Sequence, residues 1–123
     1  MPARLVYRDL RPLTQAEALE KLANREPENV AEALVAIGLH EESYEFAAET
    51  IMREGGEKDR VIRGAALVAL AHLARVHRNI PDEAIDLVRA GLKDSDEYIR
   101  GQAQTALDDI EQFVPEKAIQ LRG

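Results

Sequence analysis

The stretch Asp59-Arg60-Val61-Ile62-Arg63-Gly64-Ala65-Ala66-Leu67-Val68-Ala69-Leu70 defines this chain, because its pattern returns 37 residues later. The second copy, at residues 96–107, reads Asp-Glu-Tyr-Ile-Arg-Gly-Gln-Ala-Gln-Thr-Ala-Leu and keeps Asp, Ile, Arg, Gly, two Ala and Leu in register. A fainter copy, Ala33-Leu34-Val35-Ala36-Ile37, resembles residues 66–70. Apolar residues in each copy recur at spacings of three and four, as in a helix with one buried face. A repeat of this length with two helices per unit predicts an all-α protein of stacked helix pairs.

Caps and helix breakers place the remaining helices. Thr14 to Glu17 has the form of a capping box, Pro27 suits the first position of a helix, and Ser43 is a candidate N-cap. We expect helices over residues 15–24, 27–38, 43–54, 59–78, 81–92 and 96–113, with one further turn at 116–121. Gly38 is expected to end or loosen the second helix, and Pro115 to break the sixth. No segment shows the period-2 alternation of a strand.

The predicted core is built mainly from small and aliphatic residues, since aromatic residues make up only 4 % of the chain. The inward faces are expected to include Leu19 and Ala23 on the first helix and Val76 on the fourth. Gly64 and Gly101 hold the same place in the two copies. Because a glycine inside a helix costs about 1 kcal/mol relative to alanine, we expect each to mark a close approach between neighbouring helices.

The motif Asp-x-x-Ile-Arg-Gly-x-Ala-x-x-Ala-Leu resembles the second helix of HEAT repeats. The resemblance implies a short right-handed α-solenoid of about three helix pairs. It forms one domain over residues 1–123, with pairs at 14–38, 43–78 and 82–113 and a C-terminal tail at 115–123. In that family, an Asp in the turn and an Arg in the second helix form a ladder between neighbouring repeats. The residues that match those positions, and are therefore expected to be scaffold, are Asp59, Arg63, Asp96 and Arg100.

Composition and charge exclude several classes of site. The chain has no cysteine, which excludes disulfide scaffolds, cysteine zinc sites and thiol nucleophiles. Residues 1–13 contain no continuous apolar run, and no stretch is long enough to span a bilayer, so we expect a cytoplasmic protein that does not enter a membrane. The net charge is −7, and an acidic surface repels nucleic acid and favours a basic partner.

Two acidic clusters are the candidate partner-binding sites. The first, at the predicted turn before the third helix, comprises Glu41, Glu42, Tyr44 and Glu45. The second, near the end of the sixth helix, comprises Asp108, Asp109 and Glu111. An aromatic ring among acids suits a protein interface, whereas the alternatives are a capped helix start for the first cluster and a solvated face for the second. Neither cluster is accompanied by a nucleophile, so the sequence predicts no catalytic residue and no cofactor.

His72 and Arg75 complete the candidate binding set. The 37-residue offset between the copies pairs His72 with Asp109, so these side chains are expected to be neighbours joined by a hydrogen bond or an ion pair. A metal site made by His72, Asp108 and Asp109 is the alternative. His72 and His77 are five residues apart, which is not the spacing of three or four that places two ligands on one helix face. We therefore predict no bound metal.

The segments Ala69–His77 and Ala106–Phe113 resemble a group of short bacterial HEAT-repeat proteins. Some such proteins resemble immunity proteins of polymorphic or contact-dependent toxin systems. This resemblance implies a non-catalytic module that neutralises a basic toxin, often a nuclease, by direct binding. Two alternatives stay open. One is a HEAT-like lyase or an accessory protein of an enzyme, and the other is nucleic-acid binding through the basic helix at residues 59–78.

Overall fold

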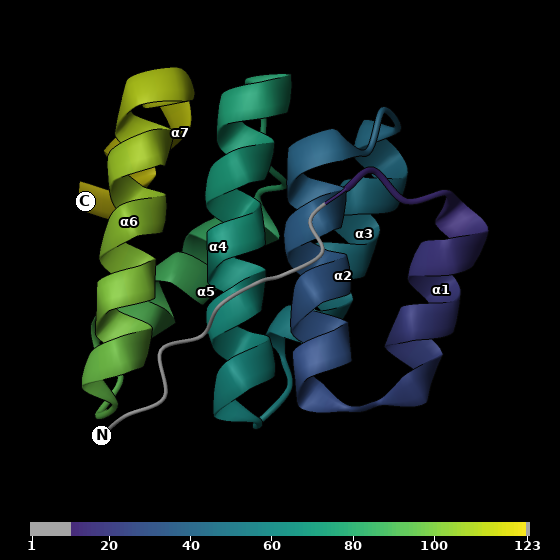
Figure 1. Ribbon diagram of the computed structural model, residues 1–123. Helices are drawn as coiled ribbons and strands as arrows, with labels where there is room; N and C mark the ends of the chain where they lie inside the picture. Colours follow the sequence, from purple (N-terminus) through teal and green to yellow (C-terminus); the bar gives the residue numbers. More distant parts are fainter. Residues whose placement is uncertain (1–10, 123) are drawn as a thin grey trace.

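The computed structural model describes residues 11–122, and its regular structure there is entirely helical, which confirms the all-α prediction (Figure 1). The helices are α1 (Gln15–Asn24), α2 (Pro27–His40), α3 (Tyr44–Gly55), α4 (Arg60–His77), α5 (Glu83–Leu92), α6 (Glu97–Phe113) and α7 (Pro115–Arg122). The start of the fifth helix and the form of the C-terminal segment differ from the prediction. α5 begins at Glu83 rather than at residue 81, because Pro81 and Asp82 form a turn. The single turn expected at 116–121 is a helix of 8 residues.

The helices lie in two layers (Figure 1). α2, α4 and α6 lie side by side in one layer, and α4 makes the most extensive helix–helix contacts of the described chain with its two neighbours. α3 and α5 lie behind this layer, where α3 packs on α4 and α5 packs on α6. α1 lies at one edge against α2, and α7 contacts both α5 and α6.

Small residues bring α2 and α4 close together. Gly38 does not end α2, which continues to His40, so the predicted helix end at residue 38 is wrong. Gly38 instead packs against the backbone of α4, where a Cβ on this glycine would lie 2.6 Å from the carbonyl oxygen of Ala69. A side chain at residue 38 would therefore push the two helices apart.

The predicted caps are confirmed. Thr14 and Glu17 form both halves of the capping box, with N–O distances of 2.9 and 3.0 Å. Ser43 accepts a hydrogen bond from the third residue of α3 at 3.2 Å. Asp59 and Asp96 each accept backbone N–H groups in the first turn of α4 and α6. Each cap satisfies donors that the helix itself leaves unpaired.

Ion pairs join α4 to the turn before α6, but with a different pairing from the predicted ladder. Arg63 Nη2 lies 2.5 Å from Asp94 Oδ2, and Arg60 Nε lies 2.6 Å from Asp96 Oδ2. The carboxylate of Asp96 is already oriented by its bond to the backbone N–H of Tyr98, so it faces Arg60, and Asp94 receives Arg63. The guanidinium of Arg60 also covers the Tyr98 ring, 4.4 Å from its centroid.

The other two predicted ladder residues have local roles. Asp59 caps α4. Arg100 donates to the carbonyl oxygens of Asp94 and Ser95 in the turn before its own helix. The first junction is instead made by Arg25, whose guanidinium lies 3.0 Å from Glu54 and 3.2 Å from Glu57.

Three side chains that were predicted to face inward are exposed. Leu19 is 47 % exposed and Ala23 lies on the same open side of α1. The buried residues of α1 are Ala18 and Leu22, because α1 has one main neighbour, α2, to pack against. Val76, in the last turn of α4, is 43 % exposed.

The two glycines of the repeated motif have different surroundings. A Cβ on Gly64 would lie 2.4 Å from Cε2 of Tyr98, so the predicted close approach is confirmed there. A Cβ on Gly101 would meet no atom within 4 Å in the part of the chain that the structure describes, so the prediction for this residue is wrong. Gly64 faces the next helix of the layer, whereas Gly101 lies on the outer side of α6.

We predict opposite effects of the same substitution at these two glycines. Gly64→Ala is expected to lower the free energy of unfolding by about 1–3 kcal/mol, because the Tyr98 ring is held by Arg60 and overpacking strains the core. Gly101→Ala is expected to raise it by about 0.5–1 kcal/mol through helix propensity. Urea unfolding followed by circular dichroism measures both values. An equal loss of stability in the two variants would contradict the assignment of Gly101 to an open surface.

The Asp94 ion pair predicts part of the acid sensitivity of the fold. The backbone N–H of Asp96 and the Arg63 guanidinium hold the pKa of Asp94 below its usual value. The unfolded chain therefore binds this proton first as the pH falls, so the stabilisation is present at neutral pH and is lost below about pH 4. We expect Asp94→Asn to be less stable than the wild type at pH 7 and to lose less stability between about pH 5 and pH 2.

Unfolding curves at several pH values test this, with Asp108→Asn as the matched control, because Asp108 lies exposed on α6. A wild-type pH dependence that Asp94→Asn leaves unchanged would refute the role of this carboxylate.

Candidate functional site

The sequence-predicted binding residues come together at one end of the molecule. α2, α4 and α6 run in the same direction, so their C-terminal ends meet at the top of Figure 1, and we refer to this end as the carboxyl end. The turn after α2, the first turn of α3, the last turns of α4 and the second half of α6 contribute the predicted residues, namely Glu41, Glu42, Tyr44, Glu45, His72, Arg75, Asp108, Asp109 and Glu111.

Glu41 holds the turn between α2 and α3 in place. Its carboxylate accepts hydrogen bonds from the side-chain amide of Gln15 at 3.2 Å and from the backbone N–H of Ser43 at 2.8 Å. Its carbonyl oxygen lies 2.9 Å from Nε2 of His77 in α4. Glu41 is therefore engaged within the chain, and the exposed acids of this cluster are Glu42 and Glu45.

Tyr44 is half-buried at the start of α3 and lies edge-on to His77, with ring centroids 5.8 Å apart. Burial raises the pKa of the Tyr44 hydroxyl, and the negative charges of Asp82, Glu45 and Glu83 raise it further. Asp82 and Glu83 belong to the start of α5, which the fold brings to the same end as α3. These two acids were not among the predicted site residues. Their only local signal is that acids favour the first turn of a helix.

His72 lies between the charged groups of three helices. Its Nδ1 is 3.0 Å from Nη2 of Arg75, and since a guanidinium only donates, His72 accepts through Nδ1. Burial lowers the pKa of His72, Arg75 lowers it further, and Asp109 opposes the shift, while His40 adds a smaller lowering. Asp109 therefore acts on His72 from α6, as the 37-residue offset predicted, while the hydrogen bond of His72 is made with Arg75.

Asp109 lies on a different side of α6 from Asp108 and Glu111, which are three residues apart. Successive residues of a helix are rotated by about 100°, so neighbours in sequence face different elements. Asp109 is half-buried and acts on His72 of α4, while Asp108 is exposed and accepts a hydrogen bond from Gln104 at 2.9 Å. Glu111 faces α7. Among residues 11–122 no three His, Asp or Glu side chains are grouped so that they could hold a metal ion. The structure therefore gives no support to a metal site made by His72, Asp108 and Asp109.

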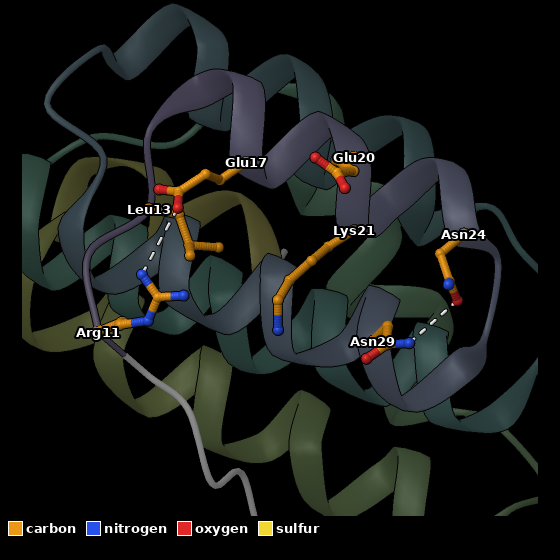
Figure 2. A pocket seen from close by; sticks show the side chains of 7 residues that line it. All are labelled: Arg11, Leu13, Glu17, Glu20, Lys21, Asn24 and Asn29. Atoms are coloured by element: carbon orange, nitrogen blue, oxygen red, sulfur yellow. Dashed lines mark hydrogen bonds and ion pairs between the residues drawn. The ribbon is translucent and has the colours of Figure 1, made fainter.

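A shallow depression of about 260 Å³ lies between the segment before α1, α1 itself and α2 (Figure 2). Its lining residues are Arg11, Leu13, Glu17, Glu20, Lys21, Asn24 and Asn29. The two cations are paired with carboxylates, since Arg11 lies 3.7 Å from Glu17 and Lys21 lies 3.3 Å from Glu32. Figure 2 shows the Arg11–Glu17 pair and the hydrogen bond between Asn29 and Asn24 at the rim. This mixture of paired charges offers no nucleophile and no net charge, so we assign it no catalytic role.

Comparisons with protein-family models, with curated proteins and with solved structures find no match to this chain. Within residues 11–122, no helix has both the length and the apolar character needed to cross a bilayer.

The geometry around His72 predicts how its pKa responds to substitution. Arg75→Ala is expected to raise the pKa of His72, because it removes a nearby positive charge and the donor that holds Nδ1 unprotonated. Asp109→Asn is expected to lower it. An NMR titration of the imidazole signals measures both shifts, with Arg78→Ala as the control, since Arg78 covers the Phe113 ring instead. If Arg75→Ala lowers the pKa or leaves it unchanged, the described contact is wrong.

Proposed function

We propose that this chain is a short right-handed α-solenoid of the HEAT type that binds another protein and catalyses no reaction. The stacking of α2, α4 and α6, with a second layer behind them, supports the solenoid. Two ion pairs support it independently. Glu57 receives Arg25 at the first junction and Asp94 receives Arg63 at the second, and these two acids are 37 residues apart, at equivalent places in the repeat. α1 and α2 then form the first helix pair, and α7 covers the last pair.

The observation that carries the proposed binding function is the gathering of exposed carboxylates at the carboxyl end. The acids exposed there come from three parts of the chain and are Glu42, Glu45, Asp82, Glu83 and Asp108. Arg75 and Arg78 are also exposed at the end of α4, but the acids named here outnumber these two arginines. A surface with an excess of one charge sign accelerates encounter with an oppositely charged protein and disfavours other partners. A basic protein domain is the partner that this surface fits.

Two of the three arginines of α4 are already paired with acids, which favours a protein partner over nucleic acid. Arg60 and Arg63 lie in ion pairs with Asp96 and Asp94, at 2.6 and 2.5 Å. A phosphate backbone that bound to them would have to displace these aspartates, and nucleic-acid affinity depends on the number of cations that reach phosphates.

Among basic proteins we favour the toxin domain that the resemblance to immunity proteins implies. A protein that masks a toxin in the cell that produces it acts in the cytoplasm. Tight neutralisation of this kind needs direct contact with a basic surface of the toxin, which exposed carboxylates provide.

The test is binding to purified basic proteins encoded beside the gene for this chain. We expect the double variant Glu42→Lys/Glu45→Lys and the single variant Asp108→Lys each to weaken binding by about tenfold or more, a loss of about 1.4 kcal/mol. We also expect wild-type affinity to fall with added salt. Isothermal titration calorimetry gives the affinities.

Glu28→Lys is the matched control, because Glu28 is exposed in the first turn of α2, at the opposite end from the carboxyl end. Binding that is unaffected by both charge reversals at the carboxyl end, or weakened equally by Glu28→Lys, would refute this surface as the binding site.

A further inference from the structure

α7 is fixed to the rest of the chain by two long side chains. Lys117 Nζ donates to the carbonyl oxygen of Ile80 and lies 3.2 Å from Asp82 Oδ1. Arg89 of α5 donates to the carbonyl oxygen of Gln120 at 2.6 Å. These contacts hold one side of α7 and set the direction in which its other side faces.

The opposite side of α7 presents an exposed apolar residue. Ile119 is 71 % exposed, more than any other large apolar side chain whose exposure the structure describes. The adjacent Ala118 is buried in the core. Because the contacts of Lys117 and Gln120 hold the inner side of α7 against the rest of the chain, Ile119 on the outer side stays exposed in the folded structure.

Ile119 borders a groove between α6 and α7. The groove has a volume of about 170 Å³ and is lined by Glu111, Pro115, Ala118 and Ile119. Its lining is apolar apart from Glu111. Asp108 lies one turn earlier than Glu111 on α6, a spacing of three residues that makes the two acids neighbours on the helix surface. The groove therefore combines an apolar lining with an acidic edge.

The exposed side of α6 continues from this groove along the helix. Gly101, Gln104 and Asp108 follow one another at spacings of three and four and are all exposed. A Cβ on Gly101 would meet no atom within 4 Å among the described residues, so another helix can approach the α6 backbone closely there. From Gly101 to Glu111 the surface runs for about 15 Å, or nearly three helical turns.

We propose that α6 and α7 form a docking surface for a basic amphipathic helix of the partner protein. An apolar residue of that helix packs on Ile119 and Ala118 in the groove, and its lysines or arginines face Asp108 and Glu111. This inference rests on the proposed function and assigns the partner contact to one surface and one kind of ligand.

Charge selects this occupant over a second copy of the chain. α6 contains four acids, Glu97, Asp108, Asp109 and Glu111, and a single base, Arg100, whose guanidinium is bonded to the turn before the helix. Two copies joined through this surface would bring like charges together, which costs free energy. A basic helix removes that repulsion and replaces it with ion pairs.

The experiment uses a synthetic peptide of about 18 residues that places leucines on one helical face and lysines on the other, with a scrambled peptide of the same composition. Fluorescence anisotropy with the full chain measures both affinities. We expect the amphipathic peptide to bind and the scrambled peptide to bind at least tenfold more weakly. Ile119→Glu and Asp108→Lys are each expected to weaken peptide binding at least tenfold, while Ile119→Leu retains it.

Leu19→Glu is the matched control. Like Ile119, Leu19 is a large apolar residue exposed on a helix, but it lies on α1 at the far edge of the molecule. Its effect on peptide affinity is expected to stay within twofold. Circular dichroism checks that each variant keeps its helical content.

Three results would overturn this inference. The first is equal binding of the two peptides, and the second is an equal effect of Ile119→Glu and Leu19→Glu. The third is a dimer in sedimentation equilibrium that Ile119→Glu dissociates, which would make a second copy the occupant. The proposed function survives these results if a basic protein still binds the wild-type chain and the Glu42→Lys/Glu45→Lys variant no longer binds it. If instead the peptide binds at Ile119 and no basic protein binds the chain, the proposed function fails and the docking surface stands.

Discussion

The close approach of α4 to both of its neighbours is the constraint on which the rest of the structure depends. Gly38 of α2 lies against the backbone at Ala69, and Gly64 lies under the ring of Tyr98 from α6. Dispersion contacts fall off steeply with separation, so three helices whose buried faces carry many alanines gain packing energy only if their backbones come this close. The same packing holds α2, α4 and α6 in one direction and thereby collects their C-terminal ends on a single surface.

The two ends of this layer carry different arrangements of charge, and the difference follows from the direction in which the helices run. At the end where α4 and α6 begin, an arginine near the start of one helix of the layer pairs with an acid in the turn before the next helix. The pairs are Arg25 with Glu57 and Arg63 with Asp94. At the carboxyl end, α3 and α5 begin, and acids in a first turn are favoured by the helix dipole. Glu45 and Glu83 therefore stabilise their own helices while they add to the negative surface. A local structural role and a partner-binding role are compatible for these residues.

Sequence patterns predicted the helices and caps well because these depend on neighbours within a few residues. The capping box at Thr14 and the cap at Ser43 are of this kind. The candidate site was predicted less completely, because Asp82 reaches Tyr44 only through the packing of α5 beside α3. The partner of Arg63 was also predicted incorrectly, since Asp94 and Asp96 each accept a backbone N–H with one oxygen and an arginine with the other, and only the packing of α4 on this turn decides which arginine each receives.

Gly64 and Gly101 show why a repeated motif does not fix the role of its residues. Both glycines follow Ile-Arg and precede the same alanine spacing, so any argument from sequence assigns them the same surroundings. Their surroundings differ because α4 has a neighbour on each side, whereas α6 is followed by α7, which packs behind it, and no other described helix covers the outer side of α6. A motif that serves helix packing inside the layer therefore leaves a backbone accessible at the edge of the layer. For that reason the proposed docking surface lies on the edge helix and not on the middle one.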